Sequence, residues 1–164
     1  MKSLVIAASA AALVAVAAPA VASAETTYYG NLGYAGIDAD SVNLGAIQGR
    51  LGAQFNPYVG VEGEVAFGVK DDDISGVKVK LNNEYGVYGV VKYPVSEQFD
   101  IFARVGYARA EAKVAGSSGS DDGVAYGVGA QYTFDGKNGV RADYTKYDFL
   151  GDADVWSVSY VRKF

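Results

Sequence analysis

The 164-residue sequence lacks cysteine and histidine entirely and contains only three prolines. Without cysteine the chain can form no disulfide and cannot be a lipoprotein precursor. Without histidine or cysteine it can assemble neither the usual catalytic triad nor a thiolate nucleophile. The glycine patterns of phosphate-binding and dinucleotide-binding loops are missing too, so we expect no enzymatic activity and no cofactor. The net charge of −5 provides no basic surface for nucleic acid.

Long apolar runs are missing from the body of the chain, but one is present at its N-terminus. Residues 4–18 (LVIAASAAALVAVAA) carry no charge and follow Lys2. Ala22-Ser23-Ala24 then gives the small-x-small pattern that signal peptidase cleaves. A transmembrane anchor is the alternative, but the stretch is short for one. We therefore expect a signal peptide over residues 1–24 and one exported domain over residues 25–164.

Glycine and tyrosine are abundant, with 21 and 13 residues, and this favours β-structure over helices. The exported part shows no helical period, and apolar and polar residues alternate in about eight segments. The expected strands are residues 27–36, 44–55, 58–69, 77–93, 99–113, 123–134, 139–148 and 153–164. Tight turns are expected at residues 56–57, 94–98 and 135–138, and longer loops at 36–43, 70–76, 114–122 and 149–152. This alternation of connections predicts an antiparallel up-and-down meander.

The stretch FNPYVGVEGEVAFG at residues 55–68 shows that each strand has two different faces. Four apolar residues alternate with glycine, alanine and two glutamates, so one face is apolar and the other carries carboxylates. The same alternation assigns Leu81 to the apolar face and Asn82 to the polar one. A soluble lipocalin-like barrel would bury the apolar face, and a membrane barrel would bury the charged face. Roughly thirty large apolar side chains would overfill the lumen of an eight-stranded barrel, which favours the membrane barrel.

The positions of the aromatic residues also favour a membrane barrel. They fall beside the expected tight turns and the C-terminus, or toward the longer loops. This is the pattern typical of strands that meet two headgroup regions. The expected membrane-interface aromatics are Tyr34, Phe55, Tyr93, Phe99, Tyr107, Tyr132, Phe134, Trp156, Tyr160 and Phe164. We therefore predict an all-β, eight-stranded, antiparallel up-and-down transmembrane β-barrel.

In its strand sequences the chain resembles the small outer-membrane β-barrels of the OmpA/OmpX-like, opacity-porin type. The resemblance rests on the signal peptide and on the blocks FNPYVGVEGEVAFG, YGVYGVVKYPV, IFARVGYAR, GVAYGVGAQYTF and VWSVSYVRKF. It covers essentially the whole mature chain. It implies a barrel in a Gram-negative outer membrane, in contact with lipid and lipopolysaccharide, with both termini in the periplasm. It also implies that Phe164 belongs to the signal read by the barrel-assembly machinery, with periplasmic chaperones acting during biogenesis. Arg162 departs from that signal, because an apolar or aromatic residue is commoner there.

Charged residues share the face that a membrane barrel would enclose. They are Arg50, Glu62, Glu64, Glu84, Lys92, Arg104, Arg141 and Asp143. A buried unpaired charge is costly, so we expect a satisfied network. Two interpretations stay open: the network fills and specifies the lumen, or an exchange of partners opens a narrow ion path. The first is favoured, because a barrel this narrow usually has no continuous channel.

Acidic residues gather in the expected loops, for example Asp38, residues 71–73 and Asp154. Their oxygen atoms suit divalent cations, but no complete calcium-loop pattern is present, so we predict no metal site. The sequence thus favours a monomeric outer-membrane barrel with a structural or surface role and at most a narrow gated pore. A small-solute porin and a soluble, lipocalin-like periplasmic binding protein are the alternatives.

Overall fold

The computed structural model describes residues 25–39, 42–70, 72–74, 77–114, 117–149 and 153–164. The regular elements in these residues are all strands, and no helix among them is long and apolar enough to cross a membrane. The strands are β1 (Thr27–Ala39), β2 (Val42–Gln54), β3 (Val59–Lys70), β4 (Asp72–Ile74), β5 (Val77–Pro94), β6 (Phe99–Val114), β7 (Ser117–Thr133), β8 (Asn138–Tyr147) and β9 (Ala153–Lys163). The predicted signal peptide, residues 1–24, lies outside the described residues and stays a prediction.

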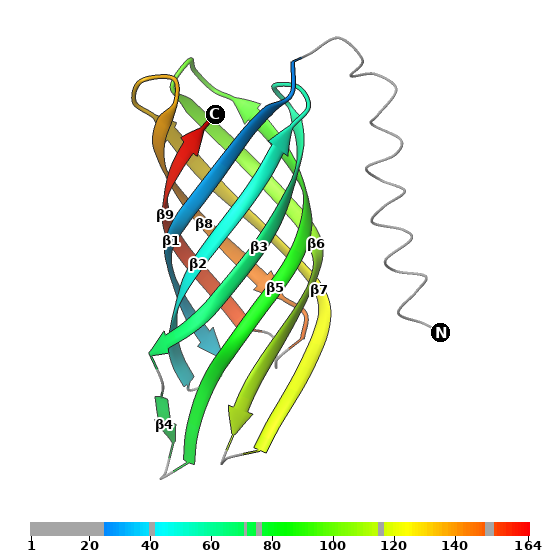
Figure 1. The fold of residues 1–164 in the computed structure, drawn as a ribbon, viewed down its shortest axis with the longest axis vertical. Helices are drawn as coiled ribbons and strands as arrows, with labels where there is room; N and C mark the ends of the chain where they lie inside the picture. The colour runs from blue at the N-terminus through cyan, green and yellow to red at the C-terminus, as the bar shows by residue number, and fades with distance from the viewer. Residues whose placement is uncertain (1–24, 40–41, 71, 75–76, 115–116, 150–152) are drawn as a thin grey trace, which may run out of the picture.

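The strands close into a barrel (Figure 1). Hydrogen-bonded neighbours follow the order β1, β2, β3 and then β5 to β9, and β9 pairs back with β1. Every one of these pairings is antiparallel. The short β4 pairs with β5 beyond the stretch that pairs with β3, so β3 and β4 together occupy one position in the barrel. The predicted eight-stranded up-and-down barrel is confirmed.

The two ends of the barrel differ in their connections. At the end we call the turn end, residues 55–58, 95–98 and 134–137 join strands, and the chain enters β1 and leaves β9 (top of Figure 1). At the opposite end, the loop end, β1, β2, β3, β6 and β7 extend further than predicted. Much of the expected loop 114–122 is strand, because residues 117–122 pair with the extended end of β6. A long partner strand continues the ladder through residues of weak β-propensity.

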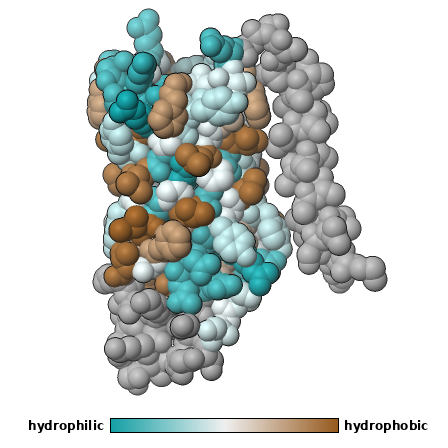
Figure 2. Space-filling model, in the orientation of Figure 1, coloured by the Kyte–Doolittle hydropathy of each residue, from teal (hydrophilic) through white to brown (hydrophobic). Residues whose placement is uncertain are grey.

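Side chains alternate strictly between the outer surface and the lumen in β3. Val65 and Phe67 are 47% and 57% exposed, whereas Glu62 and Glu64 are 1% and 3% exposed. Figure 2 shows apolar side chains across the middle of one face, with hydrophilic residues toward the turn end. The apolar face therefore looks outward, and the carboxylates point into the lumen.

One residue of the predicted apolar face lies inside the barrel. Leu81 is buried, and the register between β5 and β6 shifts between Leu81 and Asn83. Asn82 is the extra residue of a β-bulge. An inserted residue shifts the alternation by one, so the side chains before Asn82 point to the opposite face from the one that the simple alternation predicts. The predicted outward position of Leu81 is therefore wrong.

Candidate functional site: the charged lumen

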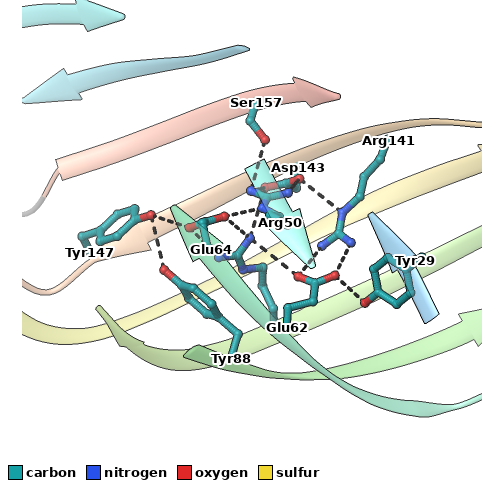
Figure 3. A network of polar contacts seen from close by, with 10 residues as sticks. Tyr29, Arg50, Glu62, Glu64, Tyr88, Arg141, Asp143, Tyr147 and Ser157 are labelled. Atoms are coloured by element: carbon teal, nitrogen blue, oxygen red, sulfur yellow. Dashed lines mark hydrogen bonds and ion pairs between the residues drawn. The ribbon is translucent and has the colours of Figure 1, made fainter. Parts of the chain in front are cut away.

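The centre of the lumen holds three arginines and three carboxylates, carried by β2, β3, β6 and β8 (Figure 3). Arg50 and Glu64 are direct cross-strand neighbours on β2 and β3, and the Nε of Arg50 donates to Glu64. The two terminal nitrogens of Arg50 donate to the two oxygens of Asp143 at 2.6 and 2.9 Å. Such a bidentate, charge-assisted pair is among the strongest hydrogen-bonded arrangements in proteins. Arg50 thereby links β2 to β3 beside it and to β8 across the lumen.

Arg104 and Arg141 complete the central cluster. Arg104 donates to both oxygens of Glu64 at 2.8 Å, and its Nη1 lies 3.9 Å from Glu62 and 4.0 Å from Asp143. Arg141 donates to both oxygens of Glu62, the longer bond measuring 3.2 Å, and its Nε lies 3.4 Å from Asp143. Each carboxylate therefore contacts at least two arginines, and the formal charges of the six residues cancel. None of the six is more than 6% exposed.

Three tyrosines that the sequence reasoning missed extend this network. The Tyr29 hydroxyl donates to Glu62 at 2.6 Å, and the Tyr147 hydroxyl donates to Glu64 at 3.2 Å. The Tyr88 hydroxyl donates in turn to the Tyr147 hydroxyl at 3.4 Å. Each carboxylate oxygen has several lone-pair directions, so the hydroxyls of Tyr29 and Tyr147 satisfy positions that the arginines leave open.

Two aromatic rings support the arginines from the side. The guanidinium carbon of Arg104 lies 3.6 Å from the centre of the Tyr88 ring, and that of Arg141 lies 3.8 Å from the centre of the Phe102 ring. Stacked guanidinium groups gain cation–π attraction and are held in one orientation. Space for the Phe102 ring comes from Gly129, where an added Cβ would collide with that ring.

Two members of the expected network lie apart from the central cluster. The Nζ of Lys92 lies 3.8 Å from Asp100, a partner that the sequence reasoning did not assign to it. Glu84 is buried, and its Oε1 has no hydrogen-bond partner within the described part of the chain. The structure thus brings together Arg50, Arg104, Arg141, Glu62, Glu64 and Asp143, and leaves Lys92 and Glu84 outside that group.

Apolar side chains occupy the lumen on the loop-end side of the network. Leu81, Tyr88, Tyr147 and Phe149 form one buried cluster with small alanine side chains from β2, β3, β6, β7 and β9. Phe149 follows the end of β8, and its ring packs edge-on against Tyr147 with centroids 5.4 Å apart. The interior therefore contains a charged layer and, next to it, an apolar layer.

The turn between β7 and β8 is fixed by a single carboxylate. Asp135 accepts hydrogen bonds from the backbone N–H groups of Lys137 at 3.0 Å and Asn138 at 2.6 Å, and from the Asn138 side chain at 2.7 Å. These bonds, the one from the Asn138 side chain first, lower the pKa of Asp135 to about 2. Gly136 has a φ of +79°, which an L side chain rarely adopts. An Asx-type turn of this kind accounts for the sharp reversal.

The ten expected interface aromatics lie on the outer surface or in the turns. Tyr34, Tyr93, Phe99, Tyr132, Phe134, Trp156, Tyr160 and Phe164 are exposed, and Phe55 and Tyr107 are half-buried. Two pairs contact each other: Tyr34 with Trp156 at 6.0 Å between ring centroids, and Tyr132 with Phe134 at 5.7 Å. Hydroxyls near the two ends are tethered, since Tyr160 donates to Asn138 and Tyr107 to Asp122.

The acidic residues of the loop end do not gather into a metal site in the residues that the structure describes. Asp38 and Asp154 are cross-strand neighbours on β1 and β9. In the described ranges no group of three or more acidic side chains could hold a metal ion. Asp40, Asp71 and Asp152 lie outside these ranges.

Comparisons with known proteins agree with this architecture. A family model described as the outer membrane protein beta-barrel domain matches residues 8–164. The structure is similar to that of Ail, the attachment invasion locus protein of Yersinia pestis, crystallised with the heparin analogue sucrose octasulfate: 19% identity, 86% of this chain and 100% of that chain covered, TM-score 0.66. It is also similar to the N-terminal barrel domain of OprF from Pseudomonas aeruginosa (12% identity, 85% and 100% covered, TM-score 0.61) and to Neisserial surface protein A (14%, 85% and 97%, 0.61). No curated protein matches the chain.

Proposed function

Because the chain belongs to the outer membrane protein beta-barrel domain family, we propose that it is a structural barrel whose lumen is closed to solutes. Its location is the cell outer membrane, where its exposed valines, leucines and aromatic rings contact lipid. This assignment removes the soluble lipocalin-like alternative. The role we propose is structural: the barrel contributes to the integrity of the cell envelope and to its surface properties.

The observation that carries the proposal is the filling of the lumen. A permeating ion or solute would have to displace the arginine–carboxylate pairs and then pass the apolar cluster around Phe149. Buried ion pairs that lose a partner cost several kcal/mol each, so such displacement is rare at equilibrium. A closed lumen is also what the width of an eight-stranded barrel favours.

The experiment is planar-bilayer recording of the refolded protein, with folding checked by heat-modifiable mobility on gels. We expect no discrete conductance steps from preparations that show the folded band. Regular steps that scale with the amount of folded protein would overturn the closed-lumen proposal and favour a porin.

A narrow gated pore is the second candidate, and one observation favours it. Arg104 is bound to Glu64 but also lies within 4.0 Å of Glu62 and Asp143, so partners for an exchange are already in place. The Glu64→Gln variant distinguishes the two candidates, because it frees Arg104 for such an exchange. Rare openings that become frequent in this variant would support a gate, and a silent variant would support the closed barrel.

We also propose that Phe164 serves as the assembly signal read by the barrel-assembly machinery. Phe164 is 74% exposed, and its backbone N–H donates to the carbonyl of Tyr28 at 2.9 Å, where β9 meets β1. The C-terminus is thus held at the seam that closes last when strands pair in chain order. Replacing Phe164 with Ser should lower the yield of folded barrel in cells and leave refolding of the purified chain unchanged.

A further inference from the structure

The outer surface of β1, β2 and β3 is hollowed. A groove of about 560 Å³ is lined by Leu32, Leu51, Val65, Tyr160 and Phe164, together with several glycines. These strands face the viewer in Figures 1 and 2, where pale residues separate the apolar ones. A Cβ added at Gly63 would meet no atom within 4 Å, and one at Gly49 would meet its nearest neighbours only at 3.9 Å. The groove therefore exists because small residues stand where the surrounding positions carry large apolar side chains.

A basic rim borders the turn end of this groove. Arg162 lies on the outer face of β9, between Tyr160 and Phe164, and its register partner on β1 is Gly30, which lines the groove. In the described part of the chain the Arg162 guanidinium makes no hydrogen bond or ion pair.

A lysine of the neighbouring turn lies at the same end of the barrel. Lys137 is exposed, and its carbonyl accepts a hydrogen bond from the backbone N–H of Lys163 at 2.8 Å. Lys163 itself is on the lumen side of β9, because it alternates with Arg162 and is the register partner of the buried Tyr29. Arg162 is therefore the cation at the edge of the groove.

We propose that the groove and its basic rim bind one glycerophospholipid of the adjoining leaflet. Arg162 would hold the phosphate, and an acyl chain would lie in the groove over Gly49 and Gly63. A guanidinium matches phosphate oxygens in a bidentate manner, and a long side chain at the interface reaches from apolar surface to headgroup level. The neighbouring Tyr160 and Phe164 place the rim at the height where aromatic residues meet headgroups. This proposal gives a role in lipid binding to Arg162, the residue of the last strand that departs from the expected assembly signal.

The test is native mass spectrometry of the refolded protein in non-ionic detergent, titrated with phosphatidylglycerol. Arg162→Gln removes the positive charge. Gly63→Leu places an apolar side chain in the groove at a position where an added Cβ meets no other atom within 4 Å. The matched control is Arg109→Gln, since Arg109 is exposed at the loop end and donates to Ser120 at 2.9 Å. All variants are first checked for heat-modifiable mobility.

We expect the wild type and the Arg109→Gln control to retain one lipid equally well. Arg162→Gln should weaken retention about fivefold, the factor that corresponds to one basic residue near a lipid surface. Gly63→Leu should weaken it by a similar factor, and inorganic phosphate should not displace the lipid. The proposal is overturned if both arginine variants behave alike or if Gly63→Leu binds like the wild type. It is overturned equally if phosphate alone competes, or if the groove is covered by a second copy of the chain, seen as a dimer that Gly63→Leu abolishes.

Discussion

Replacing Glu64 with Gln perturbs the charged lumen at its most connected carboxylate. Glu64 accepts hydrogen bonds from Arg50, from two nitrogens of Arg104 and from Tyr147. The substitution keeps the volume and removes the charge, so that three buried arginines face two carboxylates. Arg50 retains its bidentate pair with Asp143, but the remaining carboxylates lie 3.9 and 4.0 Å from Arg104.

The expected cost in the free energy of unfolding follows from this loss. Removing one partner of a buried ion pair costs about 3–5 kcal/mol. Since Arg50 keeps a complete partner, we expect the lower end of that range, about 3 kcal/mol, which is a factor of roughly 150 in the unfolding equilibrium constant. Glu84→Gln is the matched control, because it makes the same chemical change at a buried carboxylate that has no ion pair in the described residues. It should cost less than about 1 kcal/mol, since within the described residues no charge-assisted bond is lost.

The assay is urea unfolding in lipid vesicles, followed by the fluorescence of Trp156, the only tryptophan of the chain, and by gel mobility. Both probes must give the same midpoint before free energies are compared. Equal costs for Glu64→Gln and Glu84→Gln would contradict this expectation, because both positions carry a buried glutamate and they differ in their ion-pair partners.

Two further predictions concern the turn end and the fit of the lumen. Asp135 should titrate in the folded barrel with a pKa of about 2, below the value near 3.9 of an unfolded chain, so its contribution to stability is present above pH 4 and is lost as the pH falls through about 2. A carboxyl carbon titration by NMR measures this directly, and a midpoint near 3.9 would contradict the bonding in this turn. Gly129→Leu should prevent folding, because a Cβ there would lie 2.6 Å from the Ala142 carbonyl oxygen and would collide with the Phe102 ring. Gly63→Leu is the control and should give the normal heat-modifiable band, since no atom lies within 4 Å of that Cβ.

Most of the barrel could be predicted from alternation alone. Period two determines which residues share a face, and the surplus of large apolar side chains determines which face is outside. Tyr29, Tyr88 and Tyr147 are hard to predict because aromatic residues in membrane barrels are expected on the outer surface. Their positions in the alternation gave the signal: Tyr88, for example, falls on the same face as Glu84 and Lys92.

The remaining errors come from information that a single strand does not contain. The bulge at Asn82 turns the Leu81 side chain into the lumen, and the local sequence pattern does not indicate an inserted residue. Which charged residues pair within the lumen depends on the stagger between strands that are distant in the sequence. The sequence therefore predicts arginine–carboxylate pairs in general, but not the particular pair of Arg50 with Asp143, 93 residues away. The extension of β7 into a stretch rich in serine, glycine and aspartate follows from the length of β6, which is a tertiary effect.

The central claim is that the apolar face touches hydrocarbon and the charged face is enclosed. It is tested most directly by placing single cysteines at positions 65, 66 and 67 of this cysteine-free chain and attaching a fluorophore in reconstituted vesicles. We expect labels at 65 and 67 to be quenched by brominated acyl chains and not by aqueous iodide, while position 66 should react poorly because it faces the filled lumen. Quenching at 65 and 67 by iodide alone, with no effect of the brominated lipid, would contradict it.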